Sequence, residues 1–161
     1  MTAAVLTVSD SASAGTRPDL SGPAVSEALA RKGFQVVAAE VVPDERTAIE
    51  NAILHLCALA RLVVTTGGTG VAERDVTPEA TRAVCDRLVE GLAERMRSEG
   101  ARRTPFAALG RGLCGIRARS LVLNLPGSPA AATDSLAAVI DLVPHALELL
   151  DGRTQHGSQN P

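Results

Sequence analysis

Residues 62–80 read Leu-Val-Val-Thr-Thr-Gly-Gly-Thr-Gly-Val-Ala-Glu-Arg-Asp-Val-Thr-Pro-Glu-Ala, and this stretch decides the fold that we expect. An apolar, β-branched run ends in the four residues from Gly67 to Gly70, and Thr77-Pro78 then marks the start of a helix. Glycine permits positive φ angles and lets a ligand approach the backbone closely. Successive N–H groups in such a turn can converge on a phosphate. A strand, a glycine loop and a helix in this order therefore predict an anion-binding turn.

Other interpretations of this loop compete with phosphate binding. The loop lacks the Lys-Ser/Thr pair of a Walker A motif and the G-x-G-x-x-G spacing of a dinucleotide-binding turn. A glycine-rich turn between a strand and a helix can also serve tight packing alone. However, Arg74-Asp75 and a second helix start follow the glycines closely. This combination favours a ligand site over a packing turn.

Apolar, strand-like segments alternate with helical ones along the rest of the chain. We expect strands at 3–8, 34–42, 61–66 and 120–124, and the pattern is compatible with a shorter one near 115–117. We expect helices at 21–33, 45–58, from 77, at 93–101 and from 129 to about 151, with a kink or restart at Pro144. This alternation predicts the α/β class, as a single three-layer α/β/α domain with a mostly parallel central sheet. The domain is expected to span 1–152, and the polar tail 153–161 to be disordered.

Composition places the chain among ordinary globular proteins. It has 161 residues, of which 45% are hydrophobic and 21% charged, as in one domain with a substantial core. The apolar runs stay short of the roughly 18 residues of a membrane span. The N-terminus leads directly into the strand pattern at 3–8, without the basic and apolar regions of a signal peptide. We therefore expect a cytoplasmic protein without a membrane partner.

Charge, aromatic content and cysteine spacing argue against other function classes. The net charge of −2 lacks the basic excess of a nucleic-acid binder, and the two aromatic residues, Phe34 and Phe106, are too few for a base-stacking surface. Cys57, Cys85 and Cys114 are odd in number and show no metal-ligand spacing. We therefore expect reduced thiols, no zinc site and no nucleic-acid partner.

Two further loops follow predicted strands. The loop from Ser9 to Gly15 is crowded with hydroxyl and carboxylate groups, which can hold a polar ligand or a metal ion. In the loop 124–129, Pro126-Gly127 predicts a turn and Ser128-Pro129 the cap and first residue of the last helix. Each loop has a simpler interpretation, as a solvated, helix-capping loop or a plain strand–helix connection. Because ligands collect at the carboxyl ends of parallel strands, the three loops are expected to meet at one site.

Two aspartates belong to the same edge of the predicted sheet. Asp44 follows the strand 34–42, and Asp75 lies in the loop after 61–66. Asp44 could instead be the N-cap of the next helix, and Asp75 the ion-pair partner of an arginine. Carboxylates beside phosphates repel them unless a divalent cation lies between, and Mg²⁺ is bound in this way by one or two carboxylates and phosphate oxygens. We therefore expect a magnesium site that uses both aspartates.

These motifs resemble those of the molybdopterin adenylyltransferases of molybdenum-cofactor biosynthesis, the MogA/MoaB type, which also forms the G domain of gephyrin. The resemblance extends from Ala3 to about Leu150, and its most specific part is the glycine loop followed by Arg-Asp-x-Thr-Pro-Glu. The matching stretches are residues 7–13, 19–23, 42–45, 66–79, 91–97 and 123–129.

The resemblance implies a reaction, a cofactor and an assembly. In the family, the terminal phosphate of molybdopterin attacks the α-phosphate of Mg-ATP, giving adenylylated molybdopterin and pyrophosphate. ATP and molybdopterin would thus be substrates, Mg²⁺ the cofactor and the homotrimer the assembly. A molybdenum-insertion protein is a further partner consistent with this family. Positioning and charge neutralisation are the main needs of such a transfer, and no protein nucleophile is required.

Carried over residue by residue, the resemblance also implies roles in the site. Asp44 and Asp75 would be the essential aspartates, which hold Mg²⁺ and position the reacting phosphates. The implied binding residues are Ser9, Asp10, Gly67, Gly68, Thr69, Gly70, Glu94, Arg111, Pro126, Gly127 and Ser128. Glu94 and Arg111 have simpler interpretations as surface charges. Since the chain has no Trp or Tyr, adenine recognition is expected to use backbone groups and aliphatic side chains.

One departure and two alternatives remain. The family has Leu-Ser-Arg before its last strands, where this chain has Leu109-Gly110-Arg111, so one hydroxyl contact to the pterin is missing. A catalytically silent molybdopterin carrier of the same fold is one alternative, although it would gain nothing from two carboxylates near phosphates. The second alternative is a relative of the competence-damage-inducible type that acts on other nucleotides. Proteins of that type depart from the Arg-Asp-x-Thr-Pro-Glu pattern.

Overall fold

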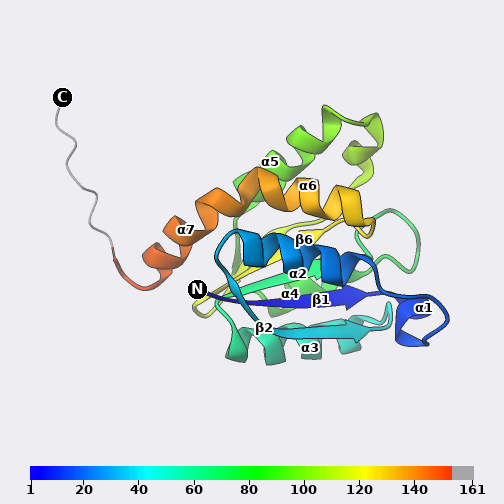
Figure 1. Ribbon diagram of the computed structural model, residues 1–161, viewed down its shortest axis with the longest axis horizontal. Helices are drawn as coiled ribbons and strands as arrows, with labels where there is room; N and C mark the ends of the chain where they lie inside the picture. The colour runs from blue at the N-terminus through cyan, green and yellow to red at the C-terminus, as the bar shows by residue number, and fades with distance from the viewer. Residues whose placement is uncertain (154–161) are drawn as a thin grey trace.

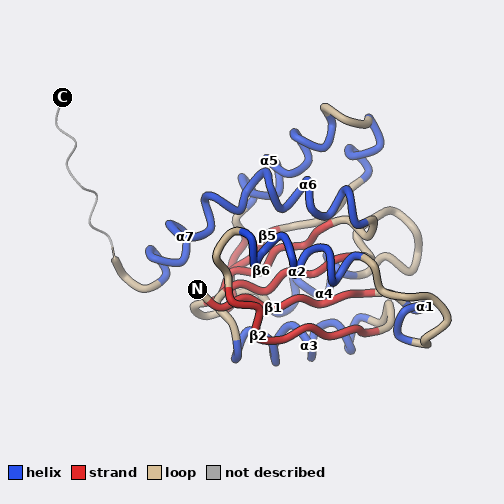
Figure 2. Tube along the Cα trace, viewed as in Figure 1, coloured by secondary structure: helices blue, strands red, loops and turns tan. Residues whose placement is uncertain are grey.

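A six-stranded mixed sheet forms the centre of the chain, whose structure, a computed structural model, describes residues 1–153 (Figures 1 and 2). The strand order is β2-β1-β3-β6-β5-β4. The strands are β1 (Thr2–Val8), β2 (Gln35–Val42), β3 (Leu62–Thr66), β4 (Arg87–Leu88), β5 (Cys114–Arg117) and β6 (Ser120–Leu125). The pairs β1–β2, β1–β3 and β3–β6 are parallel, whereas β5 is antiparallel to β6 and β4 to β5.

Helices cover both faces of this sheet and complete the three layers (Figure 1). They are α1 (Asp10–Ser13), α2 (Ser21–Arg31), α3 (Arg46–Leu59), α4 (Thr77–Val84), α5 (Glu90–Ala101), α6 (Pro129–Val139) and α7 (Val143–Leu150), with short 3₁₀ turns η1 (Pro105–Leu109) and η2 (Ile140–Leu142). Helices α2, α5, α6 and α7 pack on one face, and α3 and α4 on the other. The expected α/β fold is therefore confirmed.

The two faces of the sheet follow from the two-residue period of a strand. Every residue of β3 and β6 is buried, as expected for apolar strands covered on both sides. Val64 and Leu123 point to the side of α2, α5, α6 and α7, while Val63 and Val122 point to α3 and α4. Burying each such side chain contributes about 1.5–3 kcal/mol. The two central strands thus hold the carboxyl edge of the sheet in a fixed position.

The last helical segment is more apolar than the sequence analysis indicated. By length and composition alone, Pro129–Leu150 is long and apolar enough to cross a membrane. A stretch of 18 residues within it has a mean hydropathy of 1.2. The expectation that no run approaches this length was therefore wrong. However, η2 interrupts the segment, and Leu136, Val143 and Leu147 belong to the core on the sheet. The segment is thus a core element that needs its apolar side chains for packing.

Most expected elements are present, and the differences are local. The short strand near 115–117 exists as β5, whereas the two-residue β4 was not expected. Helix α5 begins at Glu90, three residues before the expected start, and α1 and η1 occupy segments that were expected to be loops. The restart at Pro144 is confirmed within one residue, because α7 begins at Val143. The tail expected to be disordered, 153–161, lies outside the described residues except for Arg153.

Candidate active site at the carboxyl edge of the sheet

The loops after β1, β3 and β6 meet at the carboxyl edge of the sheet. Thr66 is aligned with Thr7 on one side and with Leu125 on the other, so the three loops start side by side. The Thr66 hydroxyl donates a hydrogen bond of 2.7 Å to the carbonyl oxygen of Pro126. Gly67 N–H donates to Leu125 O at 3.2 Å. The expected convergence of the glycine loop with the loop 124–129 is therefore present.

The glycine loop has a backbone shape that requires glycine. Gly67 and Gly68 have φ angles of 101° and 61°, in the left-handed region. A Cβ atom on Gly67 would lie 2.2 Å from Val8 O, so a larger residue cannot fit there. Thr77 fixes the loop to α4, since its hydroxyl donates to Gly67 O at 2.9 Å and its N–H to Gly68 O at 3.0 Å. Tight packing alone is therefore enough to explain why residue 67 is a glycine.

Asp44 lies against this loop and is fixed by Asp10. Asp10 N–H donates to Asp44 Oδ2 at 2.8 Å, and Asp44 N–H donates to Asp10 Oδ1 at 3.0 Å. A Cβ atom on Gly68 would lie 3.1 Å from Asp44 Oδ1, which places this carboxylate beside the glycine turn. The interpretation of Asp44 as a helix N-cap is wrong, because Glu45 occupies the N-cap position of α3 and the Asp44 carboxylate bonds to the β1 loop instead.

Arg74 pairs with Asp10 and not with its neighbour Asp75. Its Nε donates to Asp10 Oδ2 at 2.9 Å and its Nη2 to Asp10 Oδ1 at 2.7 Å. The Asp44 N–H and the Arg74 guanidinium together lower the pKa of Asp10. The interpretation of Asp75 as an ion-pair partner is therefore not supported, and its carboxylate is used differently. Asp75 Oδ2 accepts the N–H of Ala72 at 2.9 Å.

The two expected metal ligands each keep one carboxylate oxygen available. Within residues 1–153, no hydrogen bond reaches Oδ1 of Asp44 or Oδ1 of Asp75. Burial raises the pKa of Asp44, and repulsion from the carboxylates of Asp10 and Asp75 raises it further. A divalent cation relieves such repulsion, so this donor set suits Mg²⁺. The described residues form no group of three or more His, Cys, Asp or Glu side chains that could hold a metal alone, and phosphate oxygens would have to complete the shell.

Arg111 links the glycine loop to helix α4. Its backbone N–H donates to Thr69 O at 2.9 Å and its Nε to Gly70 O at 2.6 Å. The guanidinium also contacts the carbonyl oxygen of Asp75 and forms an ion pair with Glu79, which lowers the pKa of that carboxyl. Arg111 is therefore no free surface charge. Its guanidinium donates to acceptors of the protein and connects the glycine loop with Glu79 of α4.

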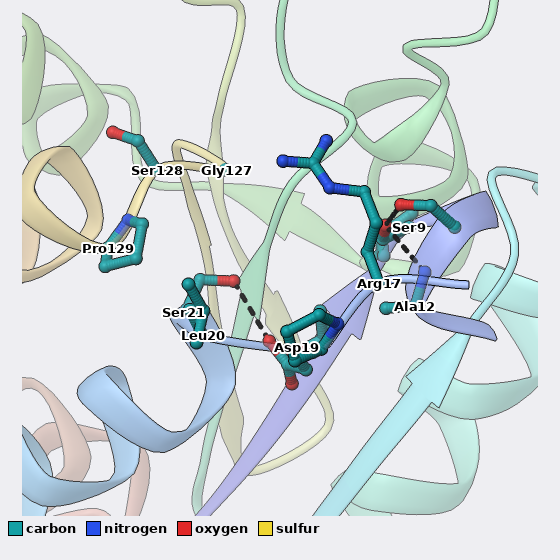
Figure 3. A pocket seen from close by; sticks show the side chains of 13 residues that line it. Ser9, Ala12, Arg17, Asp19, Leu20, Ser21, Gly127, Ser128 and Pro129 are labelled. Carbon is teal, nitrogen blue, oxygen red and sulfur yellow. Dashed lines mark hydrogen bonds between the residues drawn. The ribbon is translucent and has the colours of Figure 1, made fainter. Parts of the chain in front are cut away.

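Two cavities open at this edge and share Gly127 and Ser128. The larger, of about 630 Å³, is lined by Gly68, Thr69, Gly70 and Asp75 on one side and by α5, η1 and the first turn of α6 on the other. The smaller, of about 430 Å³, lies between the loop after β1 and the start of α6 (Figure 3). Asp44 and Asp10 line neither cavity among the described residues.

The smaller cavity contains a cation that the sequence analysis missed. Figure 3 shows the Arg17 side chain reaching into the opening between Ser9 and Gly127. The ion pairs found within residues 1–153 leave this guanidinium without a carboxylate partner. Asp19 also lines the cavity, but its carboxylate is occupied, since it accepts the N–H of Gly22 at 2.9 Å and the hydroxyl of Thr7 at 2.7 Å. No short-range pattern marks Arg17, so only the geometry reveals it.

The helix-capping interpretation of the serines is confirmed in part. Ser9 caps α1, accepting the N–H of Ala12 at 3.3 Å, and Ser128 caps α6, accepting the N–H of Ala131 at 3.3 Å. Both residues also line the smaller cavity. Capping and ligand binding are thus compatible at these two positions, because each hydroxyl can still donate its own hydrogen.

Glu94 lies apart from the two cavities, whereas Gly110 belongs to the wall of the larger one. Glu94 is exposed on α5 and lines a separate hollow of about 340 Å³ together with Arg111 and Arg97. The structure therefore does not bring Glu94 into either of the two cavities. Gly110 lines the larger cavity, where a Cβ atom would lie 3.2 Å from Ala107 O. The missing serine hydroxyl would have been located at this wall.

Comparison with known proteins agrees with this geometry. A family profile described as a probable molybdopterin binding domain matches residues 4–145. The chain belongs to this family. One relative, the molybdopterin adenylyltransferase of Helicobacter pylori (strain J99), is 43% identical over 152 residues, which cover 92% of this chain and 86% of that protein.

Solved structures of family members have the same fold. MoaB, a molybdopterin biosynthesis enzyme from Thermus thermophilus, superposes with a TM-score of 0.87 at 51% identity, over 94% of this chain and 96% of that one. MogA superposes with a TM-score of 0.88 at 38% identity, over 93% of this chain and 99% of that one. The family resemblance inferred from the sequence motifs is therefore confirmed.

Proposed function

We propose that the chain is a molybdopterin adenylyltransferase that uses Mg-ATP. A terminal phosphate oxygen of molybdopterin attacks the α-phosphorus of ATP, a new P–O bond forms, and the bond to the β-phosphate breaks. The products are adenylylated molybdopterin and pyrophosphate. The observation that carries this proposal is that Asp44 and Asp75 both lie beside the glycine loop, each with one carboxylate oxygen that accepts no hydrogen bond from residues 1–153.

The chain would act mainly by positioning and by charge. Bound Mg²⁺, held by Asp44 and Asp75, would supply neutralisation of phosphate charge. The backbone N–H groups of the loop Gly67–Gly70 would hold phosphate oxygens, and the N-terminus of α6, at Gly127 and Ser128, would offer a second anion-binding group. Because a phosphate oxygen is already anionic near neutral pH, no side chain has to remove a proton. The reacting groups are brought together instead, which reduces the entropic part of the barrier.

The cation that faces the substrate would be Arg17. Arg74 and Arg111 also lie near the glycine loop, but Arg74 is occupied by Asp10 and Arg111 by the carbonyl oxygen of Gly70. Arg17 lines the smaller cavity without a carboxylate partner in the described part of the chain. A guanidinium there can form charge-assisted hydrogen bonds to phosphate. We place the phosphates near Gly127 and Ser128, where the two cavities meet.

A silent carrier of molybdopterin is the second candidate. It would bind the pterin in the same cavities but would not need Asp44 and Asp75 together. The repulsion among Asp10, Asp44 and Asp75 raises the pKa of Asp44, and a protein that only binds an anionic ligand gains nothing from it. The crowded carboxylates therefore favour the enzyme over the carrier.

We further propose the setting in which this domain works. The domain of residues 1–152 would function in the cytoplasm as a homotrimer and would pass its product to a molybdenum-insertion protein. The three cysteines are free thiols in the structure, which is consistent with a reducing compartment, and the family resemblance supports the assembly. Sedimentation of the purified protein at several concentrations tests the trimer directly.

One experiment separates the two functions. The purified protein is incubated with molybdopterin, ATP and Mg²⁺, and the products are separated by chromatography. Appearance of adenylylated molybdopterin with an equal amount of pyrophosphate is expected for the enzyme. Binding of molybdopterin with no AMP transfer, in the presence of Mg²⁺, would identify the carrier and contradict the proposal.

A further inference from the structure

Phe106 is an aromatic side chain that is largely exposed in the part of the chain that the structure describes. It is 75% exposed, the highest value among the large apolar side chains that the structure describes as exposed. The other aromatic residue of the chain, Phe34, is 6% exposed and belongs to the core. A single exposed apolar side chain is common on protein surfaces, so what distinguishes Phe106 is its position at a cavity beside the glycine loop. The chain has no Trp or Tyr that could take this role instead.

The backbone holds this ring in a defined place. Thr104 caps the turn η1, and its side chain accepts the Phe106 N–H at 3.3 Å. Pro105 restricts the first residue of the turn. Ala107 packs against α5, where a Cβ atom on Gly100 would lie 3.0 Å from the Ala107 methyl group. Beyond the turn, Arg111 N–H donates to Thr69 O. The turn is thus attached to α5 at one end and to the glycine loop at the other.

The ring lines the larger cavity of the site. Leu109, Ala107 and Met96 line the cavity with Phe106, while the glycine loop and Asp75 form a polar wall. A volume of about 630 Å³ is in the range of small-molecule sites, which combine apolar walls with a few polar groups. If phosphates bind at the glycine loop, the group attached to them extends over the apolar wall. Flat heterocycles stack on aromatic faces whatever their hydrogen-bonding pattern.

We propose that Phe106 stacks on the flat heterocycle of a phosphate-bearing substrate, either the purine of ATP or the pterin of molybdopterin. The proposal rests on the proposed function for the identity of the two substrates, but not on the transfer step. It replaces the expectation that only backbone groups and aliphatic side chains recognise the ring system. Phe106 is a binding and specificity residue that acts through its π face.

Binding measurements on three variants test this role. Phe106→Leu keeps an apolar side chain but removes the ring, whereas Phe106→Tyr keeps the ring. Leu59→Ala is the matched control, because Leu59 is 49% exposed at the end of α3, next to the start of β3 and so at the opposite edge of the sheet. The dissociation constants of Mg-ATP and of molybdopterin are measured separately by titration calorimetry. Sedimentation of each variant reports the assembly, and AMP transfer is followed in parallel.

We expect Phe106→Leu to bind one of the two heterocyclic ligands about tenfold more weakly. Phe106→Tyr and Leu59→Ala should stay within about twofold of the wild-type affinity for both ligands. The ligand that loses affinity identifies the ring that stacks. A loss of pterin or ATP affinity in a protein that never transfers AMP would support the stacking and contradict the proposed enzyme.

Three results would overturn the inference. The first is unchanged affinity of Phe106→Leu for both ligands in a protein that does transfer AMP. The second is a changed sedimentation of Phe106→Leu with unchanged affinities, which would assign the ring to a subunit interface. The third is a wild-type protein that binds neither ligand.

Discussion

Asp10 and Asp44 exchange hydrogen bonds, each backbone N–H donating to the other carboxylate at 2.8 and 3.0 Å. These residues come from the ends of β1 and β2, which are paired in parallel with Val8 beside Val42. The exchange fixes the Asp44 carboxylate beside Gly68 and leaves its Oδ1 free toward the site. Asp10 therefore positions Asp44, and it does not need to touch the substrate to matter for the reaction.

Replacing Asp10 should lower turnover without unfolding the protein. Asp10→Ala removes the acceptor for Asp44 N–H and the partner of Arg74, so Asp44 loses one of its two hydrogen bonds to residue 10 and keeps only the one from the backbone N–H to its carboxylate. We expect kcat for AMP transfer to fall about tenfold to a hundredfold, the effect of misplacing a reacting group, with Tm nearly unchanged because the cluster is exposed. Asp10→Asn keeps an acceptor oxygen and should be less affected. Glu27→Gln, which breaks an exposed ion pair on α2, is the control and should behave as wild type.

Gly68 should tolerate no side chain for a local reason. Its φ of 61° is unfavourable for alanine, and a Cβ atom there would lie 2.4 Å from Thr77 Oγ1 and 3.1 Å from Asp44 Oδ1. Gly33 also has a positive φ, of 82°, but open space around its Cβ position. Both Gly→Ala changes should therefore cost about 1–2 kcal/mol of unfolding free energy, measured in urea, with a larger cost at Gly68. Only Gly68→Ala should abolish AMP transfer, and equal activities of the two variants would contradict the role of the turn.

Arg17 should affect substrate binding more than turnover. Removal of its guanidinium in Arg17→Ala takes away a charged donor from the smaller cavity, and we expect about tenfold weaker binding of the phosphate-bearing ligand. The wild-type affinity should also fall with added salt more steeply than that of the variant. Arg31→Ala makes the same charge change on α2, where Arg31 pairs with Glu27, and should leave the dissociation constant unchanged. An identical loss of ligand affinity in both arginine variants would mean that Arg17 acts only through the net charge of the protein. That result would contradict its position in the binding site.

The three thiols should make the protein sensitive to alkali. Burial raises the pKa of Cys57 and Cys114 to about 12 and that of Cys85 to about 11. In the unfolded chain, the thiols lose their protons near pH 8.5. Above about pH 8.5, the folded chain therefore keeps thiol protons that the unfolded chain has lost. The thiols contribute fully to the free energy of unfolding below this pH, and their contribution decreases as the pH rises toward about 11.

Alkaline titration should isolate this effect, because the chain has no tyrosine and Lys32 is its single lysine. The free energy of unfolding in urea is expected to decrease steadily between about pH 9 and 11. At pH 8, alkylation of the folded protein should be slow and alkylation of the unfolded protein fast. A Cys57→Ala, Cys85→Ala double variant should show a shallower decrease. Rapid alkylation of folded wild type at pH 8 would contradict the assignment.

The sequence predicted those parts of the site that depend on local patterns. The apolar runs of β3 and β6, the glycine turn and the Ser128-Pro129 helix start are all short-range signals, and the structure contains each of them. The order of the strands then brings the loops to one edge, because neighbouring parallel strands in a sheet place their carboxyl ends together. The family motifs added which aspartates to expect there.

The remaining parts depend on contacts between residues far apart in the chain. Asp44 looked like a helix cap because an aspartate commonly precedes a helix, but its carboxylate finds the Asp10 N–H instead. The sequence left Arg111 either as a binding residue or as a surface charge, and the fold places its guanidinium on the carbonyl oxygen of Gly70. Arg17 and Phe106 carry no sequence pattern, and only their exposure at a cavity reveals them. Such pairings follow from tertiary packing, which overrides local preference.

The claim on which the rest depends is that Asp44 and Asp75 together hold magnesium against the phosphates of the substrates. The most direct test measures AMP transfer and molybdopterin binding of Asp44→Asn and Asp75→Asn over a range of Mg²⁺ concentrations. We expect both variants to bind molybdopterin but to lose AMP transfer by at least about a hundredfold, and we expect more Mg²⁺ not to restore it fully. Full activity of both variants at the wild-type Mg²⁺ requirement would show that the two aspartates do not hold the metal.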